Sequence, residues 1–309
     1  MIVHQGLQEL SSSTQTVVTI GSFDGMHLAH RKIATLVKQE AKRLGIESAV
    51  ITFWPHPRTI LNPNSTHLLL LTTPDEKQLF LEEIGIDHLY IIPFTLEFSN
   101  WTAEHFVNEI FVKRLKTKKI ILGFDHHFGK NREGNLSYLK SNQSIFNIEV
   151  EAIEEQIIHD ATISSTEIRN ALKVGQIEIA NELLGYPYQF SGKVMKGNQM
   201  GRTIGFPTAN IFIKETYKLI PANGVYAVLV KFNKTVYQGM MNIGLRPTLN
   251  GSEKRIEVNI FDFDQDIYGE TLTILMRNSI REERKFESFD LLKDQISLDK
   301  TQALAFLST

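Results

Sequence analysis

The pattern of apolar residues changes near residue 186, and this change constrains the fold more than any other feature of the 309-residue sequence. Before that point, short apolar runs typical of buried strands alternate with segments in which apolar residues recur at helical spacing. The expected strands are residues 17–20, 49–53, 89–92, 120–122 and 148–152. The expected helices are residues 31–44, 75–84, 103–115, 165–174 and 177–184. This alternation predicts an α/β unit with helices on the faces of a parallel sheet.

After residue 186, short strand candidates are separated by glycine, asparagine and proline turns, which predicts a compact β-barrel or sandwich. These strand candidates are residues 190–194, 208–213, 225–232, 236–242, 256–263 and 271–276. A final helix is expected from residue 289 to about residue 307. Because Gly185 follows a predicted helix and begins the stretch Gly185-Tyr-Pro-Tyr188, we expect domains at residues 1–185 and 186–309.

Composition limits the classes of function. The formal net charge is −2 and the basic residues are scattered, which argues against a dedicated nucleic-acid-binding protein. The absence of cysteine excludes disulfides, thiolate metal sites and cysteine nucleophiles. The longest aliphatic run, residues 68–71, is too short to cross a bilayer. We therefore expect a soluble, cytoplasmic protein that binds small molecules but neither nucleic acid nor membrane, as a monomer or transient homo-oligomer.

Two histidines stand three residues apart where the first predicted strand passes into the first predicted helix. Gly21 and Gly25 permit a tight turn, and His27 and His30 fall on one face near the helix N-terminus. The positive end of a helix attracts anions, and two imidazoles can donate hydrogen bonds to a phosphate that gains charge in a transition state. The alternative is a pair of surface or helix-capping histidines after a glycine turn.

Three further clusters in the first half suit a nucleotide site. His56 and Arg58 follow a predicted strand and can contact phosphate, although the prolines beside them also suit a rigid connection. Residues 122–134 begin at another strand end and mix aromatic, acidic and basic side chains. Residues 163–169 start a helix with capping-box spacing, and their hydroxyls and Arg169 can bind triphosphate oxygens.

The second half contains one glycine-rich segment, residues 192–210, that leads into a predicted strand. Thr208 and Asn210 alternate along that strand, so both side-chain oxygens point to one side, as ligands of phosphate-bound magnesium would. Glu257 lies within an apolar strand and can accept a proton from a substrate hydroxyl. The alternatives are a glycine-rich hairpin of a barrel and a solvent-facing glutamate.

The first histidine motif resembles the G-x-F-D-x-x-H-x-G-H signature of the nucleotidyltransferase superfamily. With the second half included, essentially the whole chain resembles the bifunctional riboflavin kinase/FMN adenylyltransferase family, the prokaryotic FAD synthetases, because two unrelated motif sets occur in the family's order. The first set comprises Gly21-Ser-Phe-Asp-Gly-Met-His27, His30, Trp54-Pro-His-Pro-Arg58, Gly123-Phe-Asp125 and Ile163-Ser-Ser-Thr166 with Arg169. The second set comprises residues 201–210, 224–226, 242–248, Glu257 and residues 262–269.

The resemblance implies an N-terminal adenylyltransferase domain of Rossmann-like fold and a C-terminal kinase domain on a six-stranded antiparallel barrel. It implies two magnesium-dependent reactions with ATP: phosphorylation of riboflavin to FMN, and adenylylation of FMN to FAD with release of pyrophosphate. Catalytic roles are implied for His27, His30 and Glu257. The implied ATP-binding residues are Gly21, Phe23, Asp24, His27, His30, Ser164, Thr166, Arg169, Gly201, Thr208 and Asn210. The implied flavin-binding residues are His56, Pro57, Arg58 and Asp125, and the implied magnesium ligands are Thr208 and Asn210.

Three departures from the family pattern are visible. Ala29 replaces a glycine, Asn259 a residue that is usually histidine, and His126-His127 a more usual aromatic-led pair. Two other hypotheses therefore stay open: an enzyme with one surviving activity, and a flavin- or nucleotide-binding regulatory protein descended from such an enzyme. The retained catalytic candidates argue against the second.

Overall fold

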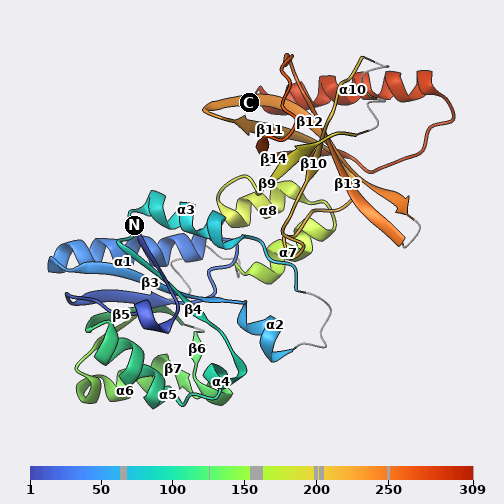
Figure 1. The fold of residues 1–309 in the computed structure, drawn as a ribbon. Helices are drawn as coiled ribbons and strands as arrows, with labels where there is room; N and C mark the ends of the chain where they lie inside the picture. The colour runs from blue at the N-terminus through green and yellow to red at the C-terminus, as the bar shows by residue number, and fades with distance from the viewer. Residues whose placement is uncertain are drawn as a thin grey trace. The chain divides into compact units, whose positions relative to one another are not determined.

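The computed structural model describes residues 1–62, 68–124, 126–153, 163–197, 201, 205–248 and 251–308, and the chain forms two compact units, residues 1–163 and 164–309 (Figure 1). The strands of the first unit are β1 (Ile2–Gln5), β2 (Thr16–Ile20), β3 (Glu47–Trp54), β4 (His88–Pro93), β5 (Thr117–Gly123), β6 (His127–Phe128), β7 (Gly134–Asn135) and β8 (Glu149–Ile153). Its helices are α1 (Leu28–Leu44), α2 (Pro57–Leu61), α3 (Pro74–Ile84), α4 (Leu96–Ser99), α5 (Ala103–Phe106), the π-helix η2 (Val107–Arg114), α6 (Leu136–Phe146) and the short 3-10 turns η1 (Leu7–Glu9) and η3 (Lys130–Arg132).

A six-stranded parallel sheet organises the first unit, in the order β1-β4-β3-β2-β5-β8. Figure 1 shows α1 and α3 on one face of this sheet and α5 and α6 on the other. Because both faces are covered, β2 is buried at every position, including its two threonines. The predicted parallel α/β architecture is confirmed.

Some elements of the first unit were not expected. The edge strand β1 was not predicted, because His4 and Gln5 occupy half of its four positions and leave no apolar run that would indicate a strand. The α6 helix and the β6–β7 hairpin lie between two predicted strands, in a polar stretch. The helix predicted over residues 103–115 begins as α5 and then widens into the π-helix η2. The wider hydrogen-bond spacing is seen at its end, where the amide of Leu115 donates to the carbonyl of Ile110 at 3.0 Å.

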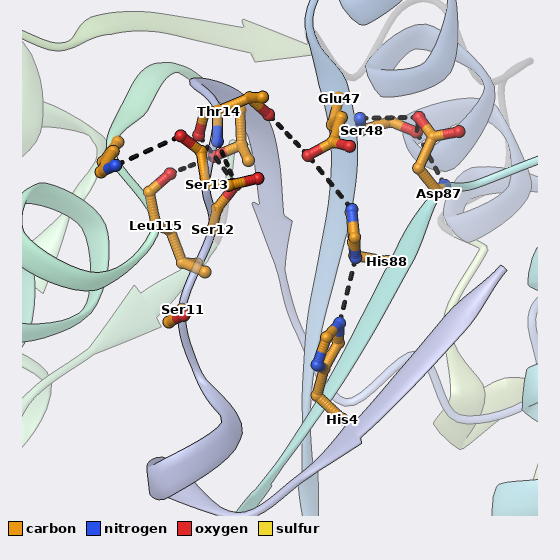
Figure 2. A network of polar contacts seen from close by, with 12 residues as sticks. His4, Ser11, Ser12, Ser13, Thr14, Glu47, Ser48, Asp87, His88 and Leu115 are labelled. Carbon is orange, nitrogen blue, oxygen red and sulfur yellow. Dashed lines mark hydrogen bonds and ion pairs between the residues drawn. The ribbon is translucent and has the colours of Figure 1, made fainter.

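A polar network joins the strands at the amino edge of the sheet (Figure 2). His4 Nε2 and His88 Nδ1 are hydrogen-bonded at 3.0 Å, and His88 Nε2 lies 3.2 Å from Glu47 Oε2. The Thr14 hydroxyl donates to the same Glu47 oxygen at 2.6 Å. These contacts connect β1, the start of β3 and the start of β4, so they hold the edge strand in place through side chains as well as backbone.

The second unit is a closed antiparallel barrel in the order β10-β13-β12-β11-β14-β9, followed by a helix. Its strands are β9 (Gln189–Met195), β10 (Ala209–Phe212), β11 (Gly224–Phe232), β12 (Thr235–Thr248), β13 (Gly251–Ile260) and β14 (Thr271–Arg281). Its helices are α7 (Ser165–Lys173), α8 (Ile177–Leu184) and α10 (Phe289–Leu307). Ala303 of α10 packs with Ala227, Met240 and Phe261 of the barrel wall. The predicted six-stranded barrel with a terminal helix is confirmed.

The chain passes from the first compact unit to the second between Ile163 and Ser164, which is earlier than the expected domain boundary at residue 185. The reason is that α8 is bonded to the barrel. Asn181 Nδ2 donates to the carbonyl of Met276 at 2.9 Å, and Glu178 Oε1 accepts from the amide of Ser279 at 3.0 Å. These partners are far along the chain, so the glycine that ends α8 marks the end of a helix rather than the end of a compact unit.

Candidate active sites

A strained turn connects β2 to α1. Phe23, Gly25 and Met26 all have positive φ angles, of 48°, 84° and 38°. Such angles cost little for glycine but of order 1–3 kcal/mol for other residues, so they persist only where surrounding contacts fix the backbone. The turn ends at His27, which is the N-cap residue of α1, and His30 lies in the helix's first turn. Ala29 lies between them with a buried methyl group.

The imidazoles of His27 and His30 stack, with ring centroids 3.7 Å apart and an angle of 19° between the planes. The Phe23 ring lies 5.1 Å from His30. Burial, followed by the charges of His27 and Lys77, lowers the pKa of His30 well below its usual value. Nδ1 of His30 is shielded from solvent and has no hydrogen-bond partner in the described part of the chain. This neutral ring therefore keeps hydrogen-bonding capacity at a helix N-terminus, where anions bind favourably.

The carboxylate of Asp24 is buried and contacts the loop before α3. Its Oδ1 accepts from the amides of Leu71 at 2.9 Å and Thr72 at 3.1 Å, and the Thr72 hydroxyl accepts from the amide of Gly25 at 3.0 Å. These bonds give Asp24 a role in fixing the turn. Sequence reasoning placed it only among the ATP contacts.

The second predicted cluster also lies at the carboxyl edge of the sheet, after β3. His56 is the N-cap of α2, its Nδ1 accepting from the Arg58 amide at 3.2 Å, and Pro57 occupies the first turn. Because the His56 ring caps α2, it has a structural role, as the alternative of a rigid connection implies. Its place at the carboxyl edge also suits ligand binding, since doubly wound sheets bind ligands at this edge. Asp125 lies outside the described residues. Further along the chain, the Nδ1 atom of His127 lies 3.2 Å from the Nη2 atom of Arg132.

The third cluster belongs to the second unit. Ser164 caps α7, accepting from the amide of Glu167 at 3.3 Å, and Arg169 is buried on the same helix. Thr166 follows in the first turn of α7. The expected capping interaction is therefore present.

In the barrel, Asn210 and Glu257 are directly opposite one another on β10 and β13. Arg255 bridges them: its Nε donates to Asn210 Oδ1 at 3.1 Å, and its guanidinium pairs with Glu257 Oε1 at 2.6 Å. Sequence reasoning selected Asn210 and Glu257 separately but missed Arg255. The signal was present, because Arg255 and Glu257 are two residues apart on a strand and therefore share a face.

Thr208 lines two cavities in the barrel unit. One, of about 400 Å³, is also lined by Gly201, Arg255 and Glu257, and the other, of about 460 Å³, by Asp264 and other residues. A Cβ atom on Gly201 would lie 2.2 Å from the carbonyl oxygen of Phe206, so this close approach requires glycine.

The departure at Asn259 has a structural explanation. Its side chain is buried, and Nδ2 donates to the carbonyl of Pro207 at 2.6 Å. Pro207 precedes Thr208, so this bond fixes the backbone that carries a predicted ligand.

In the described ranges, no group of three or more histidine, aspartate or glutamate side chains is arranged to hold a metal ion. Within those same ranges, no helix is long and apolar enough to cross a membrane.

An α/β unit with a histidine pair at a strand-to-helix turn, followed by a six-stranded barrel with Glu257 in a cavity wall, has the features expected of a nucleotidyltransferase combined with a kinase. Comparisons with known proteins agree. A family described as FAD synthetase matches residues 9–167, and a family described as riboflavin kinase matches residues 184–307.

Relatives with both activities in their names match nearly the full length. The bifunctional riboflavin kinase/FMN adenylyltransferase of Bacillus subtilis is 38% identical over 305 residues, covering 95% of this chain and 93% of that protein. The Escherichia coli K12 protein of the same name is 34% identical, covering 98% and 96%. A crystal structure from Streptococcus pneumoniae, described as a macrolide-efflux protein, has a TM-score of 0.88 and 35% identity, covering 97% of this chain and 98% of that one.

The chain belongs to the bifunctional riboflavin kinase/FMN adenylyltransferase family. It is an enzyme of FAD biosynthesis that phosphorylates riboflavin to FMN and adenylylates FMN to FAD. ATP, riboflavin and FMN are its substrates.

Proposed function

We propose that the two reactions use separate sets of residues, with adenylyl transfer at the stacked histidine pair and phosphorylation at the Asn210–Glu257 pair. The main support for the first assignment is the partly unsatisfied His30 ring beside His27 at the N-terminus of α1. The phosphate of FMN is already an anion, so its attack on the α-phosphorus of ATP needs no general base. The two imidazoles then stabilise the charge that develops as pyrophosphate leaves.

The remaining contacts at this first site are proposed from the family motifs. Gly21 and Phe23 approach the nucleotide, Asp24 fixes their turn, and Arg169 supplies a guanidinium for phosphate oxygens. Hydroxyls come from Ser164 and Thr166. The proposed flavin contacts are His56, Pro57, Arg58 and Asp125.

For phosphorylation, we propose that Glu257 accepts the proton of the terminal ribityl hydroxyl as that oxygen attacks the γ-phosphorus of ATP. FMN and ADP are the products. Support comes from the position of Glu257 on the wall of the 400 Å³ cavity and from its bridge through Arg255 to Asn210. Catalysis of this kind depends mostly on positioning and charge neutralisation, so a carboxylate held by its neighbours suits it.

Magnesium fits the same site. The Thr208 hydroxyl and the Asn210 carboxamide are hard oxygen ligands, and magnesium bound with nucleotide phosphates takes few protein ligands. Asn210 Oδ1 accepts one bond from Arg255 and retains a second lone pair. When bound, the ion neutralises phosphate charge. Gly201 allows the close backbone approach to the Phe206 carbonyl beside Thr208.

We also propose that the enzyme acts in the cytoplasm on small molecules alone, as a monomer or transient homo-oligomer. Its small net charge supports the absence of a nucleic-acid partner. The division of the two activities at residue 185 remains part of this proposal.

Two variants test the assignment in opposite directions. His30→Ala is expected to lower FAD formation from FMN by about two powers of ten while FMN formation persists, because one charge-stabilising donor is lost. Glu257→Gln is expected to lower FMN formation by about two to four powers of ten while FAD formation from supplied FMN persists. Chromatographic separation of riboflavin, FMN and FAD after incubation with ATP and magnesium measures both. A folded variant that loses the other activity, or neither, contradicts the assignment.

A further inference from the structure

A buried lysine lies directly behind the histidine turn and has no part in the roles assigned above. Lys77, on α3, exposes only 8% of its surface. Its Nζ donates to the carbonyl of Ser22 at 2.6 Å and to the hydroxyl of Thr52 at 3.0 Å. The Thr52 hydroxyl in turn donates to the Ser22 carbonyl at 3.2 Å. A buried ammonium group is costly unless it is bonded, so this cation is retained against a substantial desolvation penalty.

The segment that carries Lys77 holds the turn at two places. Lys77 holds the carbonyl of Ser22 before the first positive φ angle, and Thr72 bonds to Asp24 and Gly25 within the turn. The N-terminus of α3 between these residues is itself fixed by a capping box of Thr73 and Glu76. A rigid helix start therefore supports the unfavourable backbone from which His27 and His30 project.

Charged groups reach Lys77 from the turn and from α1. The Asp24 carboxylate raises the pKa of Lys77, but burial outweighs it and lowers that pKa to about 8. From α1, His30 faces the ammonium, which contributes to the lowered pKa of His30 together with burial and His27. β3 contributes the neutral Thr52 hydroxyl. On α3, Glu76 accepts from the amide of Thr73 at 2.9 Å.

We propose that Lys77 is a positioning residue for adenylyl transfer: its ammonium holds the Ser22 carbonyl, and thereby the turn that orients His27 and His30. This inference rests on the proposed role of the histidine pair. The lysine acts through the turn and, to a smaller extent, through its charge, which adds to burial and His27 in opposing protonation of His30. Above pH 8, where His30 is neutral in any case, loss of the lysine proton weakens its hold on the turn.

The test is Lys77→Met, which keeps the side-chain length but removes the charge and the donors. We expect its kcat for FMN adenylylation to fall by about 10²-fold, the cost typical of a misplaced catalytic group. Riboflavin phosphorylation by the same sample is expected to be unchanged. The wild-type adenylylation rate is expected to decline toward that of the variant as pH rises through about 8, whereas the variant has no such limb.

A second readout separates positioning from general destabilisation. NMR titration of isotope-labelled histidine is expected to place the His30 midpoint higher in Lys77→Met than in wild type. The matched control is Lys38→Met, which removes a half-exposed lysine paired with Asp87, and both His30 and the rate should be unchanged. Thr52→Val, which removes one partner of the ammonium, serves if Lys77→Met does not fold, and a smaller fall in kcat is expected.

Wild-type kcat and His30 titration in folded Lys77→Met, or in Thr52→Val if only that variant folds, would overturn the inference. His30→Ala, measured alongside, distinguishes the two levels of the account. If His30→Ala is slow and the lysine variant is not, only the role of Lys77 is wrong. If His30→Ala is as fast as wild type, the adenylyl-transfer site itself is misplaced.

Discussion

The two edges of the parallel sheet each carry a pair of histidines, and the pairs differ in how their nitrogens are used. At the amino edge, His4 bonds to His88 at 3.0 Å, and His88 lies 3.2 Å from Glu47 (Figure 2). At the carboxyl edge, His27 and His30 stack face to face at 3.7 Å, and the buried Nδ1 of His30 has no hydrogen-bond partner among the described residues.

The difference supports the proposal that the amino-edge pair is structural and the carboxyl-edge pair is catalytic. Buried polar groups in folded proteins are almost always hydrogen-bonded, so an exception calls for an explanation such as a missing ligand. The backbone agrees: the carboxyl-edge pair follows a turn with three positive φ angles, whereas His4 and His88 lie in regular paired strands. Residue type alone does not distinguish the pairs, but bonding and backbone strain do.

In the comparison of the two sheet edges, the largest effect is expected for His27→Ala. Removing this ring takes away one donor and the stacking partner of His30, so FMN adenylylation should fall by about two powers of ten. Combined with His30→Ala, the losses should fall short of their product, because the two rings act as a unit. Single-turnover rates of the two single variants and the double variant measure this. Fully multiplicative losses would mean that the rings act independently.

A smaller effect, on stability rather than rate, is expected for His88→Leu at the other edge. The substitution leaves His4 Nε2 without its partner and removes one of the two contacts of Glu47 Oε2, and losing the partner of a buried polar group typically costs about 1–3 kcal/mol. Both tryptophans of the chain, Trp54 and Trp101, lie in the first unit, so tryptophan fluorescence during urea unfolding reports on that unit. An unchanged unfolding midpoint would show that the network does not stabilise the fold.

The smallest effect is a pH dependence at the amino edge. Burial and the neighbouring His88 lower the pKa of His4 below its usual 6.5, against the opposing charge of Glu9. The unfolded chain therefore binds this proton more readily, and the free energy of unfolding should decrease as pH falls below 6.5. His4→Phe retains an aromatic ring against Tyr90 and should reduce this acid sensitivity. Equal acid sensitivity in both proteins would exclude His4 as its source.

Much of the fold could be predicted because burial on both faces of a sheet favours strands rich in apolar and β-branched residues, as in β2 and β3. The edge strand β1 could not, since His4 and Gln5 interrupt its short run. The places of the candidate residues in the fold were predictable as well: His27 and His30 lie at a strand-to-helix turn, and Asn210 and Glu257 lie on two barrel strands.

The partners of these residues could not be predicted, because partnership depends on register and tertiary contact. Asn210 and Glu257 face one another through β-sheet register, and Arg255 joins them only in the folded barrel. Nothing in the sequence distinguishes Lys77 from other lysines in predicted helices. Only the packing of α3 against the turn makes it a buried cation behind the histidines.

The most direct test of the contrast between the two edges is the rate of FMN adenylylation by His27→Ala and His88→Leu, measured side by side on folded protein. We expect His27→Ala to be slower than wild type by about two powers of ten. His88→Leu is expected to keep the wild-type rate despite its lower stability. Full activity in His27→Ala, or a comparable loss in His88→Leu, would contradict the assignment of the carboxyl-edge pair to catalysis and the amino-edge pair to structure.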